Sequence, residues 1–133
     1  MAIIKDVIYC LNAKNEKNDG NTNANGILAS ILPEYIPGSF SFSTIVVILN
    51  FENKPCTINV KFYDPDDEKL AETGLITLPP QQNQYNIPDE YMGANLSVDW
   101  QNIVFKKEGV YQTVVEMDGE IFKKPIYVKG RNQ

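Results

Sequence analysis

Short apolar segments with a spacing of two residues run through most of this sequence, and turn-forming residues separate them. In residues 56–63, four apolar side chains alternate with Thr57, Asn59 and Lys61. Successive side chains of a β-strand point to opposite faces, so this spacing is typical of a strand with one buried face. No stretch has the pattern of an amphipathic helix of ordinary length, which disfavours α/β folds. We therefore expect an all-β protein.

The same pattern predicts about seven to nine short strands, which suggests an antiparallel β-sandwich with at most a short helical turn near Pro88. Asp118-Gly119 is a preferred pair for a tight two-residue hairpin loop. A phase change before Ile103 indicates a bulge, and Pro125 makes the last strand an edge or a locally unpaired strand. The segments with strand character are residues 3–11, 27–32, 40–51, 56–63, 70–78, 94–105, 109–117 and 120–129.

Between the first two of these segments, residues 12–25 contain six asparagines together with lysine, Asp19-Gly20 and threonine. Such a composition cannot build a core. We expect a mobile loop or a hairpin tip here.

The length and composition fit one domain that spans residues 1–133. Hydrophobic residues make up 43% of the chain and charged residues 22%, which excludes wholesale disorder. The formal net charge of -5 opposes non-specific attraction to nucleic acid or to anionic lipid. We therefore expect no nucleic-acid partner and no membrane partner.

The chain contains no histidine. This removes histidine-based triads, histidine-ligated zinc and imidazole proton shuttles. The sequence also has no nucleophile elbow, phosphate-binding loop or dinucleotide fingerprint. We expect a protein that is not an enzyme and that carries no catalytic residue and no cofactor.

Cys10 and Cys56 are the two cysteines, and each lies in or next to an apolar stretch. Buried free thiols are the favoured interpretation, and a single disulfide stays open. The N-terminal residues lack the pattern of a secretory signal, and the longest apolar run, residues 45–49, is too short to span a bilayer. We expect a cytoplasmic protein.

The C-terminal third resembles the last hairpin of immunoglobulin-like bacterial domains. Residues 108–121 combine a Gly-x-Tyr entry, an alternating strand, a turn and an edge strand. The resemblance implies that Tyr111 is a tyrosine-corner residue, with its ring in the core and its hydroxyl bonded to nearby backbone. The whole chain is similar to a family of small, uncharacterised bacterial proteins with immunoglobulin-like folds. This resemblance implies a fold and no activity.

The densest acidic cluster is Asp64, Asp66, Asp67 and Glu68. Several carboxylates from one loop could hold a hard cation such as calcium, so the three aspartates are weak metal candidates. The spacing lacks the glycine and the distal glutamate of a dedicated calcium loop. We favour a solvated turn that is preset by Pro65, with the acids exposed.

Three tyrosines in the connections, Tyr35, Tyr85 and Tyr91, are the candidate partner-binding residues. Tyrosine supplies rigid amphipathic contact area, and the loops of a sandwich commonly bind partners. Taken singly, each tyrosine is better explained by packing over the ends of the core. Together they predict a non-catalytic module that binds an unknown protein partner or self-associates.

Carbohydrate binding is the alternative function. In this hypothesis the loop tyrosines and Trp100 stack on a sugar ring, and the amides of residues 82–84 meet its hydroxyls. The strand phase of Trp100 predicts, however, that its side chain faces the core.

Overall fold

The computed structural model describes residues 2–15, 22–49, 55–79 and 86–132. In these residues the chain forms ten strands and one short 3-10 helix. Their bounds are β1 Ile3–Asn15, β2 Thr22–Ile27, β3 Ser30–Ile31, β4 Gly38–Leu49, β5 Cys56–Tyr63, β6 Lys69–Glu72, β7 Ile76–Leu78, η1 Asp89–Tyr91, β8 Gly93–Phe105, β9 Gly109–Met117 and β10 Glu120–Val128.

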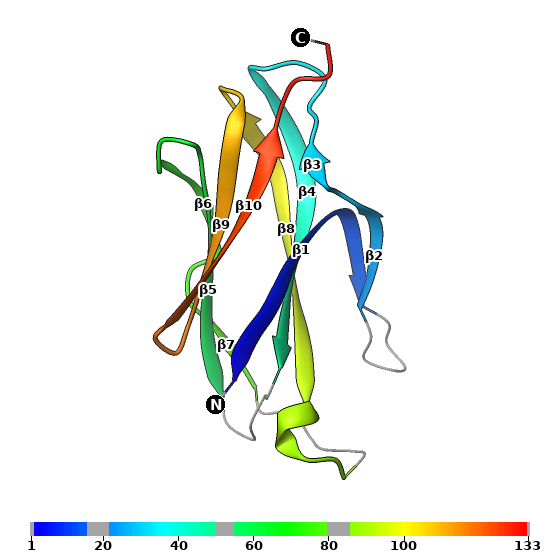
Figure 1. Ribbon diagram of the computed structural model, residues 1–133, viewed down its shortest axis with the longest axis vertical. Helices are drawn as coiled ribbons and strands as arrows, with labels where there is room; N and C mark the ends of the chain where they lie inside the picture. Colours follow the sequence, from blue (N-terminus) through cyan, green and yellow to red (C-terminus); the bar gives the residue numbers. More distant parts are fainter. Residues whose placement is uncertain (1, 16–21, 50–54, 80–85, 133) are drawn as a thin grey trace.

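The strands make two sheets that pack as a sandwich (Figure 1). One sheet has the order β2-β1-β4-β8, and the other has the order β3-β10-β9-β5-β6, with β7 also paired to β5. The all-β sandwich and the single helical turn after Pro88 are thus confirmed. The described residues contain one strand more than the upper estimate, and β3 pairs with β10 in parallel rather than antiparallel fashion.

Two local features explain the higher strand count. The segment expected at residues 70–78 splits into β6 and β7, because Gly74 adopts a positive φ of 77° between them. The second feature is a hairpin in the asparagine-rich stretch. Strand β1 continues to Asn15 and pairs there with β2, which begins at Thr22 and is separate from β3. Of the two alternatives predicted for residues 12–25, a mobile loop is wrong at both ends of the stretch, whereas a hairpin agrees with the antiparallel pairing there; residues 16–21 lie outside the described residues. Ladder hydrogen bonds do not depend on the side chain, so asparagines can occupy an edge hairpin.

Strand β4 is the centre of the four-stranded sheet, with β1 on one side and β8 on the other. Its middle residues, Ser43 to Val46, are buried on both faces. Burial on both faces agrees with the sequence, where alternation gives way to the apolar run of residues 45–49.

A bulge in β8 keeps the large side chains of this strand in the core. Phe42 pairs with Trp100 and Phe40 pairs with Ile103, so β8 holds one extra residue between these pairs. Asn102 takes a positive φ of 53° in the bulge. Trp100, Ile103 and Phe105 are consequently all buried, as the phase change predicted.

The hairpin of β9 and β10 turns at Asp118-Gly119, with φ values of 47° and 86°. Two positive φ angles are the requirement of the tight turn that this residue pair favours. The bounds of β9 and the loop agree with the sequence prediction, and β10 ends one residue earlier than predicted.

Pro125 lies on β10 opposite Gln112. Because a two-residue loop closes with the hydrogen-bonded pair of Met117 and Glu120, Pro125 occupies a non-hydrogen-bonded position, and its nitrogen faces away from β9. The proline thus removes a donor only from the open edge, as predicted. Two residues further on, Tyr127 and its neighbour pair with β3, so the end of β10 is covered.

The core between the sheets contains a cluster of four aromatic rings. Phe42 and Phe105 come from one sheet, and Phe62 and Tyr111 come from the other; the ring centroids of Phe105 and Tyr111 are 5.1 Å apart. The Tyr111 hydroxyl donates a 2.7 Å hydrogen bond to the carbonyl oxygen of Lys107, four residues upstream. The expected geometry of Tyr111 is therefore confirmed.

Cys10 and Cys56 are free and buried. Burial raises the pKa of both thiols, that of Cys56 to about 11. The thiolate is the reactive form, so both side chains act as packing groups at neutral pH.

Candidate functional site

The three candidate tyrosines do not form one surface. Tyr35 precedes β4 and is 56% exposed, whereas Tyr91 precedes β8 and is 68% exposed. Because β4 and β8 are antiparallel, with Gly38 opposite Phe105, their starts lie at opposite ends of the sandwich (Figure 1), about 35 Å apart along the strand. Tyr85 lies outside the described residues. Since Tyr35 and Tyr91 are exposed, the expectation that each packs over the core is wrong for both.

Trp100 is not available for a sugar platform. Its side chain is 6% exposed, and its ring nitrogen donates a 3.2 Å hydrogen bond to the hydroxyl of Thr44 within the core. The prediction that Trp100 faces inward is confirmed, which removes it from the carbohydrate hypothesis. The amides of residues 82–84 lie outside the described residues.

The acidic turn after β5 is organised by a buried aspartate. Asp64 is 6% exposed, and its Oδ1 accepts hydrogen bonds from the backbone N–H groups of Asp66 at 2.8 Å and Glu68 at 2.9 Å. The expectation that all acids of this turn are exposed is therefore wrong for Asp64. Its side chain satisfies backbone donors in a tight turn, as aspartate commonly does.

A lysine already occupies the acidic side of this turn. The Nζ atom of Lys107 lies 3.7 Å from Oδ2 of Asp64 and forms an ion pair with Asp66. The hydrogen bond to Asp66 raises the pKa of Lys107. Within the described residues, no group of three or more Cys, Asp and Glu side chains is arranged to hold a metal ion. The turn is thus best described as a structural one.

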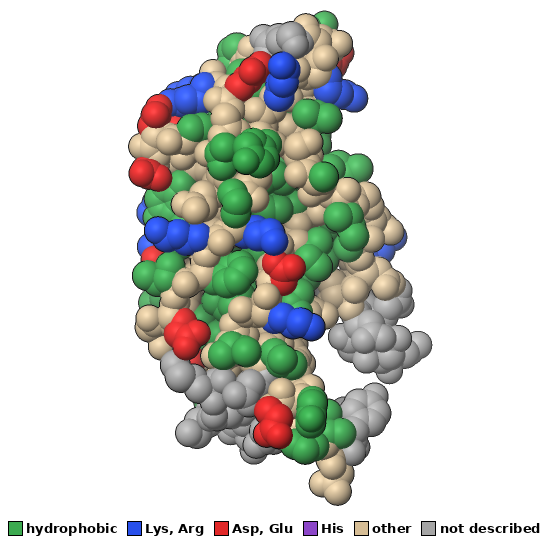
Figure 2. Space-filling model, in the orientation of Figure 1, with side chains coloured by type: hydrophobic (Ala, Val, Ile, Leu, Met, Phe, Trp, Pro, Cys, Tyr) green, Lys and Arg blue, Asp and Glu red, His purple; other side chains and the backbone are tan. Residues whose placement is uncertain are grey.

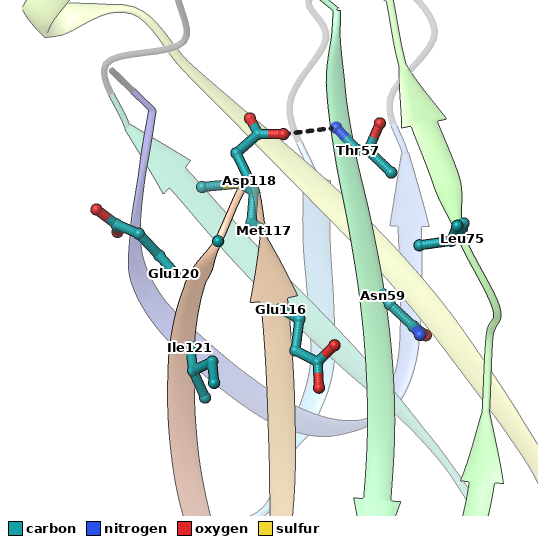
Figure 3. Close-up of a pocket in the computed structure, with 9 residues that line it drawn as sticks. Thr57, Asn59, Leu75, Glu116, Met117, Asp118, Glu120 and Ile121 are labelled. Carbon is teal, nitrogen blue, oxygen red and sulfur yellow. Dashed lines mark hydrogen bonds between the residues drawn. The ribbon is translucent and has the colours of Figure 1, made fainter.

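A groove of about 440 Å³ lies on the outer face of the six-stranded sheet, beside the β9–β10 turn (Figure 3). Adjacent strands supply its floor in one row, since Ile121 pairs with Glu116 and Glu116 pairs with Asn59. Leu75, which precedes β7, lies on the other side of the groove from Ile121. Nine residues line it: Thr57, Asn59, Leu75, Glu116, Met117, Asp118, Gly119, Glu120 and Ile121.

The two nonpolar side chains at the margins of this groove are unusually exposed. Leu75 is 79% exposed and Ile121 is 63% exposed. Both lie next to glycine-containing turns, where no strand of the described residues covers them. Sequence reasoning missed this pair because the two residues are 46 positions apart. The one available signal was the position of Ile121 directly after the tight turn. The alternation in the last strand predicts that its side chain faces outward.

The groove is also acidic. Glu116 and Asp118 bring two carboxylates to it, whereas the carboxylate of the lining residue Glu120 points away from Leu75 (Figure 3). Glu116 forms a 3.0 Å ion pair with Lys61, which raises the pKa of that lysine. Asp118 accepts a 3.4 Å hydrogen bond from the backbone N–H of Thr57. The pair with Lys61 offsets one carboxylate, so a net negative charge remains between the nonpolar margins.

The face of the molecule drawn in Figure 2 has a mixed surface. On the face drawn in Figure 2, side chains of both charge signs lie between exposed hydrophobic ones, with no large field of one sign. In the groove, two exposed nonpolar margins and unbalanced carboxylates occur together. None of the helical segments in the described part of the chain has the length and apolarity that a membrane crossing requires.

The fold and the surface thus define a two-sheet β-sandwich with an open groove on its larger sheet. The chain belongs to a family of unknown function (DUF6941), whose model matches residues 5–129. No curated protein matches the chain. Among solved structures it is similar to the crystal structure of the C-terminal domain of wzt, with 8% sequence identity and a TM-score of 0.50. That match covers 96% of this chain and 73% of the other, and it shows a shared fold.

Proposed function

We propose that this protein is a non-catalytic interaction module that binds a protein partner through the groove between Leu75 and Ile121. The observation that carries the proposal is the placement of two strongly exposed nonpolar side chains on either side of carboxylates. Burial of exposed nonpolar area supplies affinity, and charge complementarity supplies specificity. We expect the partner segment to present a nonpolar side chain next to lysine or arginine.

The tyrosines at the two ends stay candidates for additional contacts. Tyr35 and Tyr91 are too far apart to grip one small ligand, so each would serve a separate part of a large partner surface. Two free thiols support the cytoplasmic location expected from the sequence. An immunoglobulin-like relationship is supported by the tyrosine-corner geometry of Tyr111.

Selection from a random peptide library tests the proposal. Wild-type protein should enrich peptides in which leucine or another nonpolar residue neighbours a basic residue, and binding should weaken with added salt. The double variant Leu75→Ser and Ile121→Ser should lose these peptides and keep its melting temperature, because both side chains are exposed. The matched control is Tyr35→Ser with Tyr91→Ser, which should keep them.

Two results would overturn the proposal. One is an enriched set without basic and nonpolar neighbours. The other is peptide binding that the Leu75 and Ile121 substitutions leave unchanged.

A further inference from the structure

We infer that two copies of this chain pair edge to edge through the first half of β8, in antiparallel orientation, about a two-fold axis at Ser97. This inference concerns the four-stranded sheet and is independent of the groove on the other sheet. It rests on three observations: an unprotected edge, a self-complementary sequence and a buried hydroxyl without a partner.

The first observation is that β8 is an edge strand of the four-stranded sheet. It pairs with β4 on one side, and no strand of the described residues pairs with its other side. The regular part of this edge, residues 93–100, ends at the bulge around Asn102. It contains no lysine and no proline, and its one charged residue is Asp99. Unpaired backbone groups along such an edge are a template for another strand.

The other edges formed by the described strands carry more protective features than residues 93–100 of β8. Strand β10 has Pro125 at its open edge, and Lys124 forms a 3.0 Å ion pair with Asp6 that ties β10 to β1. Strands β6 and β7 are four and three residues long. Strand β2 has six residues and includes Gly26 at a φ of 69°. Prolines, charges and short or irregular strands are the usual devices against edge pairing.

The second observation is that residues 94–100 complement themselves when they are reversed about Ser97. On the outer face, Asn95 of one copy would lie opposite Asp99 of the other. Asp99 accepts a 2.5 Å hydrogen bond from Ser43 at Oδ1, and its Oδ2 can accept one from the Asn95 amide of the other copy. On the inner face, Leu96 would lie opposite Val98 of the other copy. No like charges meet in this register, and cross-strand pairs of this kind stabilise sheets.

The third observation is the Ser97 hydroxyl. It is buried and has no hydrogen-bond partner among the described residues. Buried polar atoms are normally satisfied, so an unsatisfied one requires an explanation. At the proposed axis Ser97 lies opposite its own copy, with Cβ atoms about 5 Å apart. After rotation of the side chains, the two hydroxyls can then bond to each other.

Charge changes at Asn95 test both the partner and the register. Asn95 is exposed on β8, so substitutions there should leave the melting temperature unchanged. In the Asn95→Asp variant, the new carboxylate lies opposite Asp99 of the other copy, and this repulsion occurs twice per dimer. In the Asn95→Lys variant, the same two positions form ion pairs. Sedimentation equilibrium of the full chain should show a dimer that is roughly three- to tenfold weaker for the first variant and tighter by a similar factor for the second.

The controls are Thr77→Asp and Thr77→Lys, at the exposed position of β7, which should leave the dimer unchanged. A wild-type chain that stays monomeric at millimolar concentration overturns the inference. It is also overturned if both Asn95 variants shift the equilibrium in the same direction or leave it unchanged.

A cysteine at the axis gives a second, independent measurement. Residues directly opposite in an antiparallel pair have Cα separations within the range of a disulfide. Under mild oxidation, Ser97→Cys should form a covalent dimer and Asn95→Cys should not, since Asn95 faces Asp99. The native thiols are buried, which keeps the background low. Dimers that Ser97→Cys fails to cross-link would overturn the position of the axis.

Discussion

The hydroxyl oxygen of Tyr9 lies 2.5 Å from the hydroxyl oxygen of Thr113, across the space between the two sheets. The same tyrosine donates a 2.9 Å hydrogen bond to the carbonyl oxygen of Lys124. Both hydroxyl-bearing side chains are buried. One residue of β1 is therefore bonded to both β9 and β10.

Tyr9→Phe should lower the free energy of unfolding by about 1–3 kcal/mol, because it leaves the buried Thr113 hydroxyl without this partner. Urea denaturation measures the change. Tyr127→Phe is the matched control, since Tyr127 is 67% exposed and should lose almost nothing. Equal effects of the two substitutions would contradict the role of the Tyr9 hydroxyl.

Stability should fall at alkaline pH. Burial raises the pKa of Tyr9 to about 12, so between roughly pH 10 and pH 12 the unfolded chain loses this proton while the folded chain keeps it. The stabilisation is complete below the unfolded pKa and is lost as pH rises through this window, by roughly 2–3 kcal/mol for a shift of two pKa units. Tyr9→Phe should show a shallower decline of unfolding free energy with pH. Parallel curves for the two proteins would contradict this assignment.

The buried aspartate of the acidic turn should matter more than its exposed neighbour. Asp64→Ala removes the acceptor of two backbone N–H groups and should cost about 1–3 kcal/mol of unfolding free energy. Asp66→Ala removes an exposed ion pair with Lys107 and should cost less than about 1 kcal/mol. Thermal and urea unfolding of both variants measure the difference. The reverse order of stability would contradict the role given to Asp64.

Two glycines with positive φ should respond differently to alanine. Gly109 has a φ of 141°, and a Cβ atom there would lie 2.9 Å from Cγ of Pro65. Gly119 has a φ of 86° and open space around it. Gly119→Ala should therefore cost only the strain of the left-handed conformation, about 1–2 kcal/mol, and Gly109→Ala should cost more. Urea unfolding of the two variants tests the order.

The exposed tyrosines should be neutral for stability. Tyr35→Ala and Tyr91→Ala remove side chains that are more than half exposed, so the melting temperature should stay within experimental scatter. Differential scanning calorimetry measures this directly. A large decrease would show that these rings pack on the core after all.

The strands that were predictable from sequence are those in which nonpolar and polar side chains alternate, because this alternation indicates one buried face. Residues 109–117 and the Asp118-Gly119 turn are examples, because alternation and turn chemistry are both local properties. The bulge before Ile103 was predictable for the same reason, since an extra residue shifts the phase of the apolar positions.

Features that depend on distant residues were not predictable. The continuation of β1 into the asparagine-rich stretch rests on backbone pairing with β2, to which the side chains contribute little. The burial of Asp64 depends on the turn that its own carboxylate organises. The groove forms because Leu75 and Ile121, which are far apart in the sequence, lie on either side of the same strands. No local sequence pattern indicates that arrangement.

The bonds of Tyr9 to Thr113 and Lys124 also set an order of events during synthesis. Their partners are separated by 104 and 115 positions along the chain. While a ribosome is still making the polypeptide, the Tyr9 hydroxyl lacks both of these partners until the last hairpin has emerged. Contacts of such long range slow folding. The surroundings of Tyr9 are therefore completed last, and chaperones that shield nascent chains would have their greatest effect before the last hairpin has emerged.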